Sequence, residues 1–146
     1  MPKQLKSDYF AKIQHLVKHG APPKGAKDGS VPTHPVVLVP PLSEADVLKQ
    51  CMSWLKIRRV VCDRNNTGTG DLQGTGNIYR YGIKDGGDIM GVTPGGFHFE
   101  IECKCGAGGR WSKGQQKRCK KIRKSNGLYF VVHGVEELSH YLLEYL

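Results

Sequence analysis

Three residues near the middle of the chain have the types and the spacing to hold a divalent metal and to activate water. Glu102 and Lys104 alternate within residues 97–105 (FHFEIECKC), and Asp88 lies on a separate short segment bounded by glycines. Hydrolysis of a phosphodiester near neutral pH needs a cation that offsets developing charge and a group that aims the attacking water. Two carboxylates supply the hard oxygen ligands that suit Mg²⁺ or Mn²⁺, and the lysine can orient the water.

Residues 97–105 must form a β-strand for this geometry to hold. Alternate side chains of a strand face opposite sides, so one face is apolar and the other polar. The polar face carries His98, Glu100, Glu102 and Lys104. Charged side chains are rare on a central strand unless they are paired or bind something. The alternative is an exposed ion pair between Glu102 and Lys104 on an edge strand.

The hydrophobic periodicity predicts the elements that position these residues. Helices are expected at residues 8–19, from Ser43 to about Ile57, at 112–125 and at 135–146, and strands at 59–63, 78–82, 87–91, 97–105 and 128–132. This order predicts an α/β fold with a mixed central sheet flanked by helices. Residues 20–41 hold six of the eight prolines and predict a strap that is not a packed element. We therefore expect an N-terminal helix and strap at 1–41 and a compact domain at 42–146.

The charge of the chain favours a polyanionic partner. The formal net charge is +9, and residues 110–124 hold eight basic side chains and no acid. Lysines at helical spacing predict a face that binds DNA phosphates, with a solvated helix face as the alternative. These lysines are Lys113, Lys117, Lys120, Lys121 and Lys124. The glycine-rich segment 64–76, which begins with Arg64, Asn65 and Asn66, is expected to be a loop that contacts DNA or belongs to the active site, or else a mobile surface loop. Arg64 and Asn66 are the candidate DNA-binding residues of this loop.

The sequence contains no apolar stretch near the roughly 20 residues of a membrane helix and no apolar signal core. We therefore expect a cytoplasmic protein without a membrane partner.

Six short motifs in one order resemble the virus-type replication-repair nuclease domain, VRR-NUC, of the PD-(D/E)xK nuclease superfamily. They are an early helical Glu44, the R-x-N-x-G loop at Arg64–Gly68, Asp88 after Asp85-Gly86-Gly87, Ile101-Glu102-Cys103-Lys104, the S-x-x-Q start at Ser112–Gln115, and Gly127 before an apolar strand. The pattern departs at Asp85, where the family has Gly. The motifs span residues 44–132, about 60% of the chain.

The resemblance implies a restriction-endonuclease-like core with Asp88, Glu102 and the backbone carbonyl of Cys103 as metal ligands. It implies that Glu44 is an additional metal or water ligand and that Gln115 bonds metal-bound water or phosphate. The alternatives are an acid near the positive end of its helix for Glu44 and a polar helix-start residue for Gln115.

The expected function is that of a Mg²⁺- or Mn²⁺-dependent DNA endonuclease. Family members occur as stand-alone phage proteins and as domains of DNA-repair enzymes, and the stand-alone forms are associated with dimers that act on branched DNA such as Holliday junctions. The size of this chain fits the stand-alone type, so we expect a homodimer, encoded by a phage and acting in the host cytoplasm. A non-catalytic DNA-binding module, or a nuclease with an RNA or site-specific duplex substrate, stays open.

Overall fold

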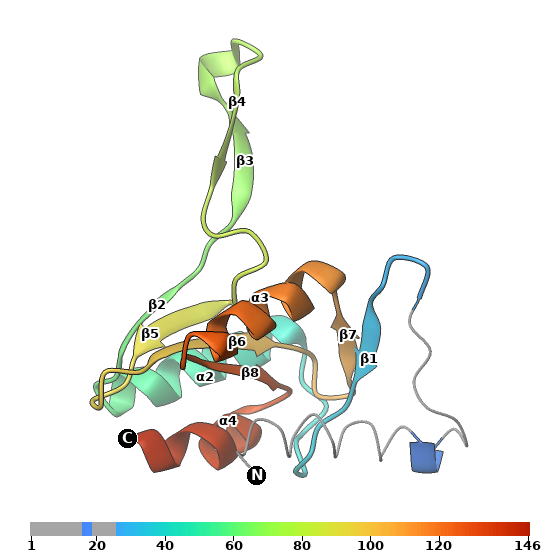
Figure 1. The fold of residues 1–146 in the computed structure, drawn as a ribbon, viewed down its shortest axis with the longest axis vertical. Helices are drawn as coiled ribbons and strands as arrows, with labels where there is room; N and C mark the ends of the chain where they lie inside the picture. The colour runs from blue at the N-terminus through green and yellow to red at the C-terminus, as the bar shows by residue number, and fades with distance from the viewer. Residues whose placement is uncertain (1–15, 19–25) are drawn as a thin grey trace.

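The computed structural model describes residues 16–18 and 26–146 and shows a mixed α/β fold around a four-stranded sheet (Figure 1). The strand order is β2–β5–β6–β8, with bounds Val61–Arg64, Ile89–Val92, His98–Cys103 and Leu128–Val132. β5 pairs antiparallel with β2 and with β6, whereas β6 and β8 are parallel. The strand with the candidate residues, β6, is therefore an interior strand.

Helices cover both faces of this sheet, which confirms the predicted mixed sheet flanked by helices. On one face, α2 (Glu44–Ile57) and α4 (Val135–Leu142) contact each other and the sheet, and η2 (Leu143–Tyr145) extends α4. On the other face lies α3 (Lys113–Lys124), whose side chains bond to β6. The apolar side chains between the sheet, α2 and α4 form the core, and they include Val47, Cys51, Leu55, Phe99, Ile101, Cys103, Phe130, Val132 and Leu138.

Two helices begin at serine caps that the sequence indicated. The Ser43 hydroxyl accepts a hydrogen bond from the Asp46 N–H at 3.2 Å, and α2 begins at Glu44, directly after Ser43. Ser112 and Gln115 form a full capping box, because each side chain accepts from the backbone N–H of the other residue. The second cap fixes the position of Gln115 at the first turn of α3.

A two-stranded hairpin projects away from the rest of the domain (Figure 1). It consists of β3 (Gly68–Asp71) and β4 (Ile78–Tyr81), with η1 (Leu72–Gly74) at its tip, and we call these residues, 68–81, the arm. The predicted loop at 64–76 is therefore wrong for most of its length. The arm forms because the tyrosines of β4 pair with the glycines of β3 and cover them, and the sequence of β3 alone does not show this.

The other predicted strands differ mainly at their ends. Arg59 has φ +56° and lies in the turn after α2, so β2 begins later than the predicted strand at 59–63. The predicted strands at 78–82 and 87–91 correspond to β4 and β5, which belong to different sheets.

The proline-rich segment contains a packed strand. β1 (Val31–Thr33) pairs with β7 (Gly109–Trp111), so the expectation of an unpacked strap is wrong here. Buried His133 bonds to Glu137 at 2.8 Å and to the Thr33 hydroxyl at 3.0 Å, which joins this strand to the core. The predicted boundary at residue 41 stays a prediction. The predicted N-terminal helix at 8–19 lies outside the described residues except for 16–18, which are helical.

Within the part of the chain that the structure describes, no helix has the length and apolar character needed to cross a membrane.

Candidate active site

The polar side chains at the end of β6 are buried beneath α3. Lys104 Nζ donates to Glu102 Oε1 at 3.0 Å, and Gln115 Nε2 donates to the same oxygen at 2.7 Å. Glu102 is only 3% exposed and Lys104 only 6%. The alternative of an exposed ion pair on an edge strand is therefore wrong, and the pair requires another explanation.

Asp88 lies directly before β5 and meets Glu102 across the strand ends. Its Oδ2 accepts a hydrogen bond from the Cys103 N–H at 2.8 Å, in the place where the next ladder bond between β5 and β6 would form. Burial, and after it the charge of Asp88, raise the pKa of the Glu102 carboxyl to about 7 against the opposing effect of Lys104. Burial also raises the pKa of Asp88, while its bond to Cys103 and the charges of Lys104 and Arg64 lower it.

These two carboxylates fit a hard divalent cation. Within the described residues, Asp88 Oδ2 and Glu102 Oε1 accept hydrogen bonds. The other two carboxylate oxygens, Asp88 Oδ1 and Glu102 Oε2, accept none from these residues and could serve as metal ligands. The N–H and C=O of a strand residue face the same neighbouring strand, so the Cys103 carbonyl lies on the side of Asp88. No three His, Cys, Asp or Glu side chains in the described ranges form a metal-binding group, so a cation here would take two carboxylates, this carbonyl and water.

The structure places the other predicted site residues at different distances from this centre. Glu44 is exposed at the first turn of α2, and its charge raises the pKa of Glu102, but no hydrogen bond of the described residues joins it to the three central side chains. Arg64 ends β2 and acts electrostatically on Asp88. Asn66 is exposed between β2 and β3.

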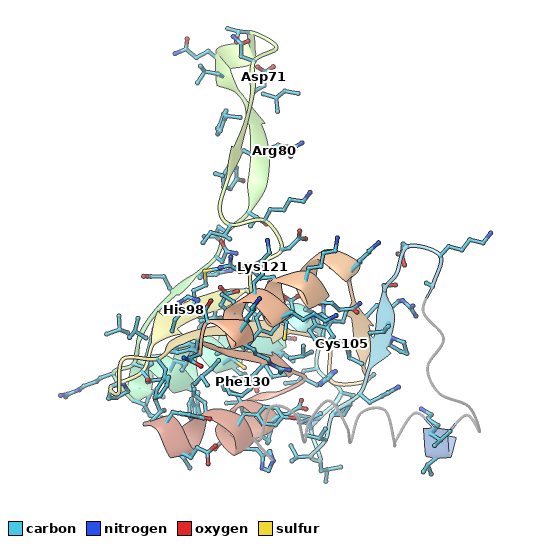
Figure 2. All side chains as sticks on the ribbon, viewed as in Figure 1. Asp71, Arg80, His98, Cys105, Lys121 and Phe130 are labelled. Atoms are coloured by element: carbon cyan, nitrogen blue, oxygen red, sulfur yellow. The ribbon has the colours of Figure 1, made fainter. Side chains whose placement is uncertain are left out.

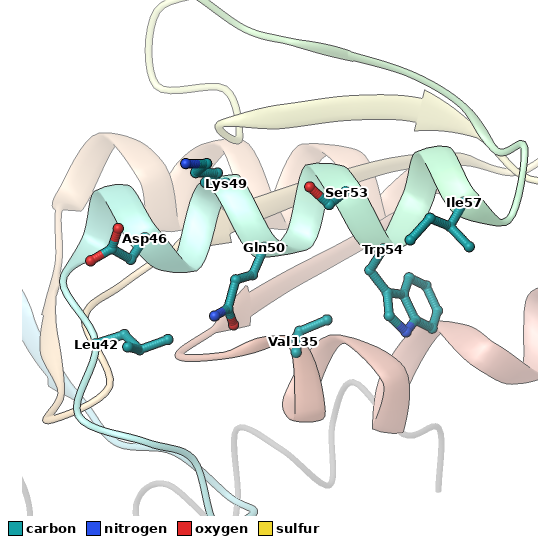
Figure 3. Close-up of a pocket in the computed structure, with 8 residues that line it drawn as sticks. All are labelled: Leu42, Asp46, Lys49, Gln50, Ser53, Trp54, Ile57 and Val135. Atoms are coloured by element: carbon teal, nitrogen blue, oxygen red, sulfur yellow. The ribbon is translucent and has the colours of Figure 1, made fainter.

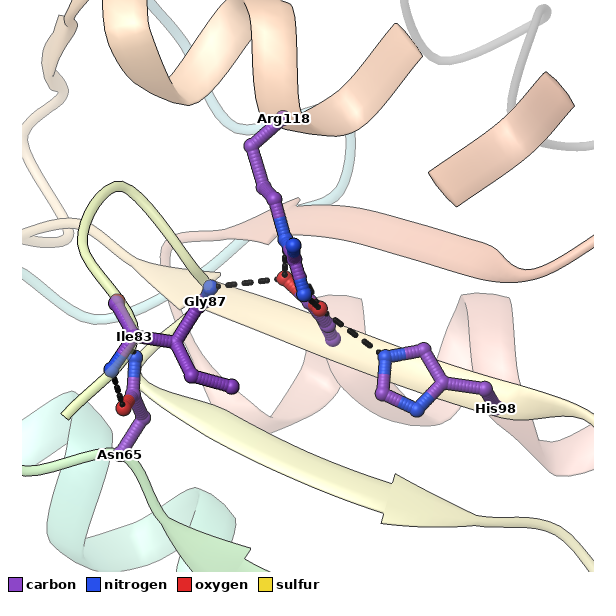
Figure 4. A network of polar contacts seen from close by, with 6 residues as sticks. Asn65, Ile83, Gly87, His98 and Arg118 are labelled. Carbon is purple, nitrogen blue, oxygen red and sulfur yellow. Dashed lines mark hydrogen bonds and ion pairs between the residues drawn. The ribbon is translucent and has the colours of Figure 1, made fainter. Parts of the chain in front are cut away.

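Asn65 holds the base of the arm beside Asp88. Its side chain accepts from the Ile83 N–H at 3.0 Å and donates to the Ile83 carbonyl at 2.9 Å (Figure 4), and its own N–H bonds to the Asp88 carbonyl at 2.8 Å. Sequence reasoning grouped Asn65 with the DNA-contacting loop. The available signal was an asparagine directly after a strand, a position where its side chain commonly bonds to nearby backbone.

A cleft of about 550 Å³ separates the candidate centre from the arm. Asp88, Glu102 and Gln115 line one side, and residues of the arm and its base line the other. The sequence patterns gave no functional role to several of these residues, among them Arg80, Tyr81, Lys84 and Asp85. Asp85 lies against Gly114 at the start of α3, where the helix dipole favours a negative charge.

A second hollow, of about 480 Å³, lies on α2 beside Val135 at the start of α4 (Figure 3). It is lined by Trp54 and Ile57 and by polar residues of α2, and none of the predicted catalytic residues reaches it. The cleft beside Asp88 is therefore the candidate active site.

Glu100 faces the same side of β6 as Glu102 but has a different environment. Burial alone raises its pKa, yet bonds from Arg118, the Gly87 N–H and His98 bring the pKa below its ordinary value. Arg118 Nε lies 3.1 and 3.2 Å from the two carboxylate oxygens, and Gly87 N lies 3.0 Å from Oε2 (Figure 4). Glu100 therefore joins α3 to the sheet as a stably charged group.

The basic residues around α3 divide into two sets. The arginines bond inward: Arg118 to Glu100, Arg123 to the Tyr129 carbonyl at 2.9 Å, and Arg110 to the Ser30 hydroxyl at 2.8 Å. The five lysines that the sequence assigned to DNA are all exposed, and Figure 2 shows Lys121 among them. The structure thus leaves the lysines available to a partner and uses the arginines internally.

No family model, no curated protein and no solved structure matches this chain.

Proposed function

We propose that this protein is a Mg²⁺- or Mn²⁺-dependent DNA endonuclease with a restriction-endonuclease-like core, similar to VRR-NUC domains. The observation that carries the proposal is the pairing of the buried Glu102 carboxylate with the half-buried Asp88 carboxylate, beside Lys104 at an open cleft. Burial raises the pKa of Glu102 and the negative charge of Asp88 adds to that rise, and a bound cation would offset the repulsion between the two carboxylates.

Asp88, Glu102 and the Cys103 carbonyl would hold the cation. When bound, a divalent metal lowers the pKa of water and offsets charge on the phosphate. Lys104 would donate to the attacking water or to the phosphate oxygens. Gln115 orients the site, because its Nε2 bonds to Glu102 and its Oε1 lies 3.4 Å from Lys104 Nζ. Glu44 is the candidate for a more distant role through a water molecule.

The exposed lysines of α3 would bind the DNA backbone beside this cleft. Lys113 to Lys124 share the helix whose first turn carries Gln115, so a phosphate backbone along α3 leads to the candidate centre. Arg64 and Asn66 would contact the backbone on the opposite side of Asp88. We expect a homodimer acting on branched DNA, since two sites in one particle can cut two strands of a junction.

A non-catalytic DNA-binding module is the second candidate, and the pairing of Glu102 with Asp88 argues against it. A protein that only binds a polyanion has no use for two acids kept together at a cost in stability. DNA binding alone would use the exposed lysines, but it would not use the pairing of Asp88 with Glu102.

The test is cleavage of labelled single-stranded, duplex, flap and four-way-junction DNA, with RNA counterparts, in Mg²⁺, Mn²⁺ or EDTA. We expect cleavage of branched DNA that needs metal and is lost in Asp88→Ala, while this variant still binds DNA. Wild-type turnover in excess EDTA would overturn the mechanism. Tight binding without cleavage in either metal would favour the binding module, and preferred cleavage of RNA or of one duplex sequence would correct the substrate.

A further inference from the structure

The arm has two different faces. Cross-strand partners in an antiparallel pair share a face, so Gly68 with Tyr81 and Gly70 with Tyr79 form one face of the hairpin. The pairs on the other face are Thr69 with Arg80 and Asp71 with Ile78. One face is thus aromatic and the other is mixed.

The tyrosine rings lie over the glycines. A Cβ atom at Gly70 would lie 2.5 Å from Cζ of Tyr79, and a Cβ at Gly68 would overlap the ring of Tyr81 in the same way. The glycine backbone covers one side of each ring, and Tyr79 and Tyr81 remain 49% and 47% exposed. Their centroids are 6.3 Å apart along the arm. The result is two neighbouring aromatic surfaces that are supported from below and open to solvent.

This aromatic face continues into the candidate active site. Tyr81 and Arg80 line the same cleft as Asp88 and Glu102, and Tyr79 is the next aromatic residue outward. Residues 64–84 carry three basic side chains, Arg64, Arg80 and Lys84, against one acid, Asp71. Asp71 accepts a hydrogen bond from the Gly76 N–H within the tip. The positive charge matches a phosphate backbone, and Figure 2 shows Arg80 along the arm.

We propose that Tyr81 and Tyr79 stack on successive unpaired bases of the DNA strand whose phosphate lies at Asp88 and Glu102. In a duplex the bases are stacked on one another, whereas unpaired nucleotides present their faces to aromatic side chains. The inference rests on the proposed nuclease function and deepens it, because it assigns the arm to substrates with single-stranded nucleotides next to the cleavage point.

A second copy of the chain fits the arm less well. Each strand of the arm has four residues, and one face has only two large apolar side chains, so it offers far less than the roughly 800 Å² per partner of a stable interface. The tip adds exposed Leu72 and otherwise small or polar residues, Gln73 to Asn77.

The test compares the binding of a blunt DNA duplex and of the same duplex with a single-stranded tail, measured by fluorescence anisotropy on the full chain in EDTA. We expect the wild type to prefer the tailed DNA. Tyr81→Ala and Tyr79→Ala should each weaken binding of the tailed DNA by about 10-fold and leave the blunt duplex unchanged. Tyr81→Phe should retain tail binding, because it keeps the ring. Ile78→Ala is the matched control, since Ile78 is exposed on the same strand but on the other face, and it should change nothing.

Three results would overturn the proposal. The first is that the tyrosine variants lose binding affinity equally for blunt and tailed DNA, and the second is that Ile78→Ala loses as much affinity for tailed DNA as they do. The third is that Tyr79→Ala changes the mass of the free protein measured by light scattering, which would assign the arm to self-association. The proposed function fails separately: tyrosine-dependent tail binding without cleavage in Mg²⁺ or Mn²⁺ would leave the arm as a single-strand binding element. Metal-dependent cleavage combined with binding that does not depend on the tyrosines would support the nuclease function and contradict the proposed role of the arm.

Discussion

Two glutamates on one face of β6 differ in what surrounds them. Glu100 and Glu102 are both buried on the face that α3 covers. At Glu100 the arginine of α3, a backbone N–H and a histidine supply enough hydrogen bonds to bring the pKa below its ordinary value. At Glu102 burial, followed by the charge of a second carboxylate, Asp88, raises the pKa to about 7 although Lys104 opposes the rise.

The difference separates a structural acid from a candidate metal ligand. The hydrogen bonds of Glu100 neutralise its charge within the fold, so a cation would gain little there. Glu102 has one oxygen held by Lys104 and Gln115, and it lies with Asp88 on the same side of the cleft. Perturbed carboxylates of this second kind are typical of functional sites.

The largest expected effect comes from exchanging each glutamate for glutamine. Glu102→Gln should lower cleavage by about 1000-fold or more, since loss of a metal ligand removes several kcal/mol of transition-state stabilisation. Its stability without metal should be unchanged or higher. Glu100→Gln should instead destabilise the fold by about 3 kcal/mol, because Arg118 loses its partner. Cleavage of labelled DNA and unfolding in urea measure the two effects.

The matched control removes both charges of the structural pair. Glu100→Gln combined with Arg118→Gln should recover part of the stability that Glu100→Gln loses. If Glu100→Gln remains folded yet loses cleavage as completely as Glu102→Gln, the distinction between the two acids is wrong.

A second prediction uses the proton at Glu102. The pKa of Glu102 is raised from 4.5 to about 7. Between these two pH values the carboxyl of Glu102 is protonated in the folded protein and ionised in the unfolded chain. The metal-free protein should therefore lose stability as pH rises from about 5 to 8, by up to about 3 kcal/mol. Mg²⁺ should restore stability at pH 8 and have little effect at pH 5. Thermal unfolding with and without Mg²⁺ measures this, and Glu102→Gln should show a much flatter profile. A wild-type profile that Mg²⁺ leaves unchanged at pH 8 would argue against a metal at this site.

A third, smaller effect concerns the support of Glu102. Gln115→Ala should weaken Mn²⁺ binding and activity by about 10- to 100-fold, as is usual when a partner of a metal ligand is removed. Gln116→Ala is the matched control, because Gln116 bonds to the backbone of Gly29 and Trp111 outside the site. Calorimetric titration with Mn²⁺ separates the two variants. Equal losses in both would mean that Gln115 acts only through the stability of α3.

The elements around the candidate site were largely predictable, because local patterns encode them. The alternation in residues 97–105 predicted β6, and the cap at Ser112 placed Gln115 where it reaches Glu102. The role of Glu100 was not predictable, since its partner lies 18 residues away on another element.

The missed elements depend on partners distant in sequence or on residues that locally favour loops. β1 pairs with β7, and Arg110 of β7 bonds to Ser30, 80 residues away. β3 contains two glycines, which favour loops, and it becomes a strand because Tyr79 and Tyr81 cover them. The pairing of β3 with β4 brings Arg80 and Tyr81 to the cleft, so the sequence patterns predicted the acids of the site but not the residues on the opposite side of the cleft.

The smallest expected effect tests the outer surface of α3 against the buried centre. Lys117 and Lys121 are exposed and make no contact with the carboxylates, so they should act only on binding. When the logarithm of the binding constant is plotted against the logarithm of the salt concentration, each lost phosphate contact makes the slope shallower by about 0.9 for duplex DNA. The double variant Lys117→Ala with Lys121→Ala should therefore make this slope shallower by up to about 2. The apparent KM should rise while the rate at saturating DNA stays near the wild-type value. The effect should be similar across sequences, because phosphate contacts position a protein without reading bases.

The matched control for this double variant removes two exposed lysines from the opposite side of the sheet. Lys49→Ala with Lys56→Ala on α2 changes the net charge equally and should leave the slope nearly unchanged, because α2 covers the face away from α3. Lys104→Ala should show the reverse of the α3 variant, with a collapsed rate and a nearly unchanged slope, since Lys104 is buried beside Glu102. A wild-type slope in the α3 variant would make this helix a solvated face. The DNA surface would then lie around Arg64 and the arm, where the same salt titration on Arg64→Ala and Arg80→Ala would locate it.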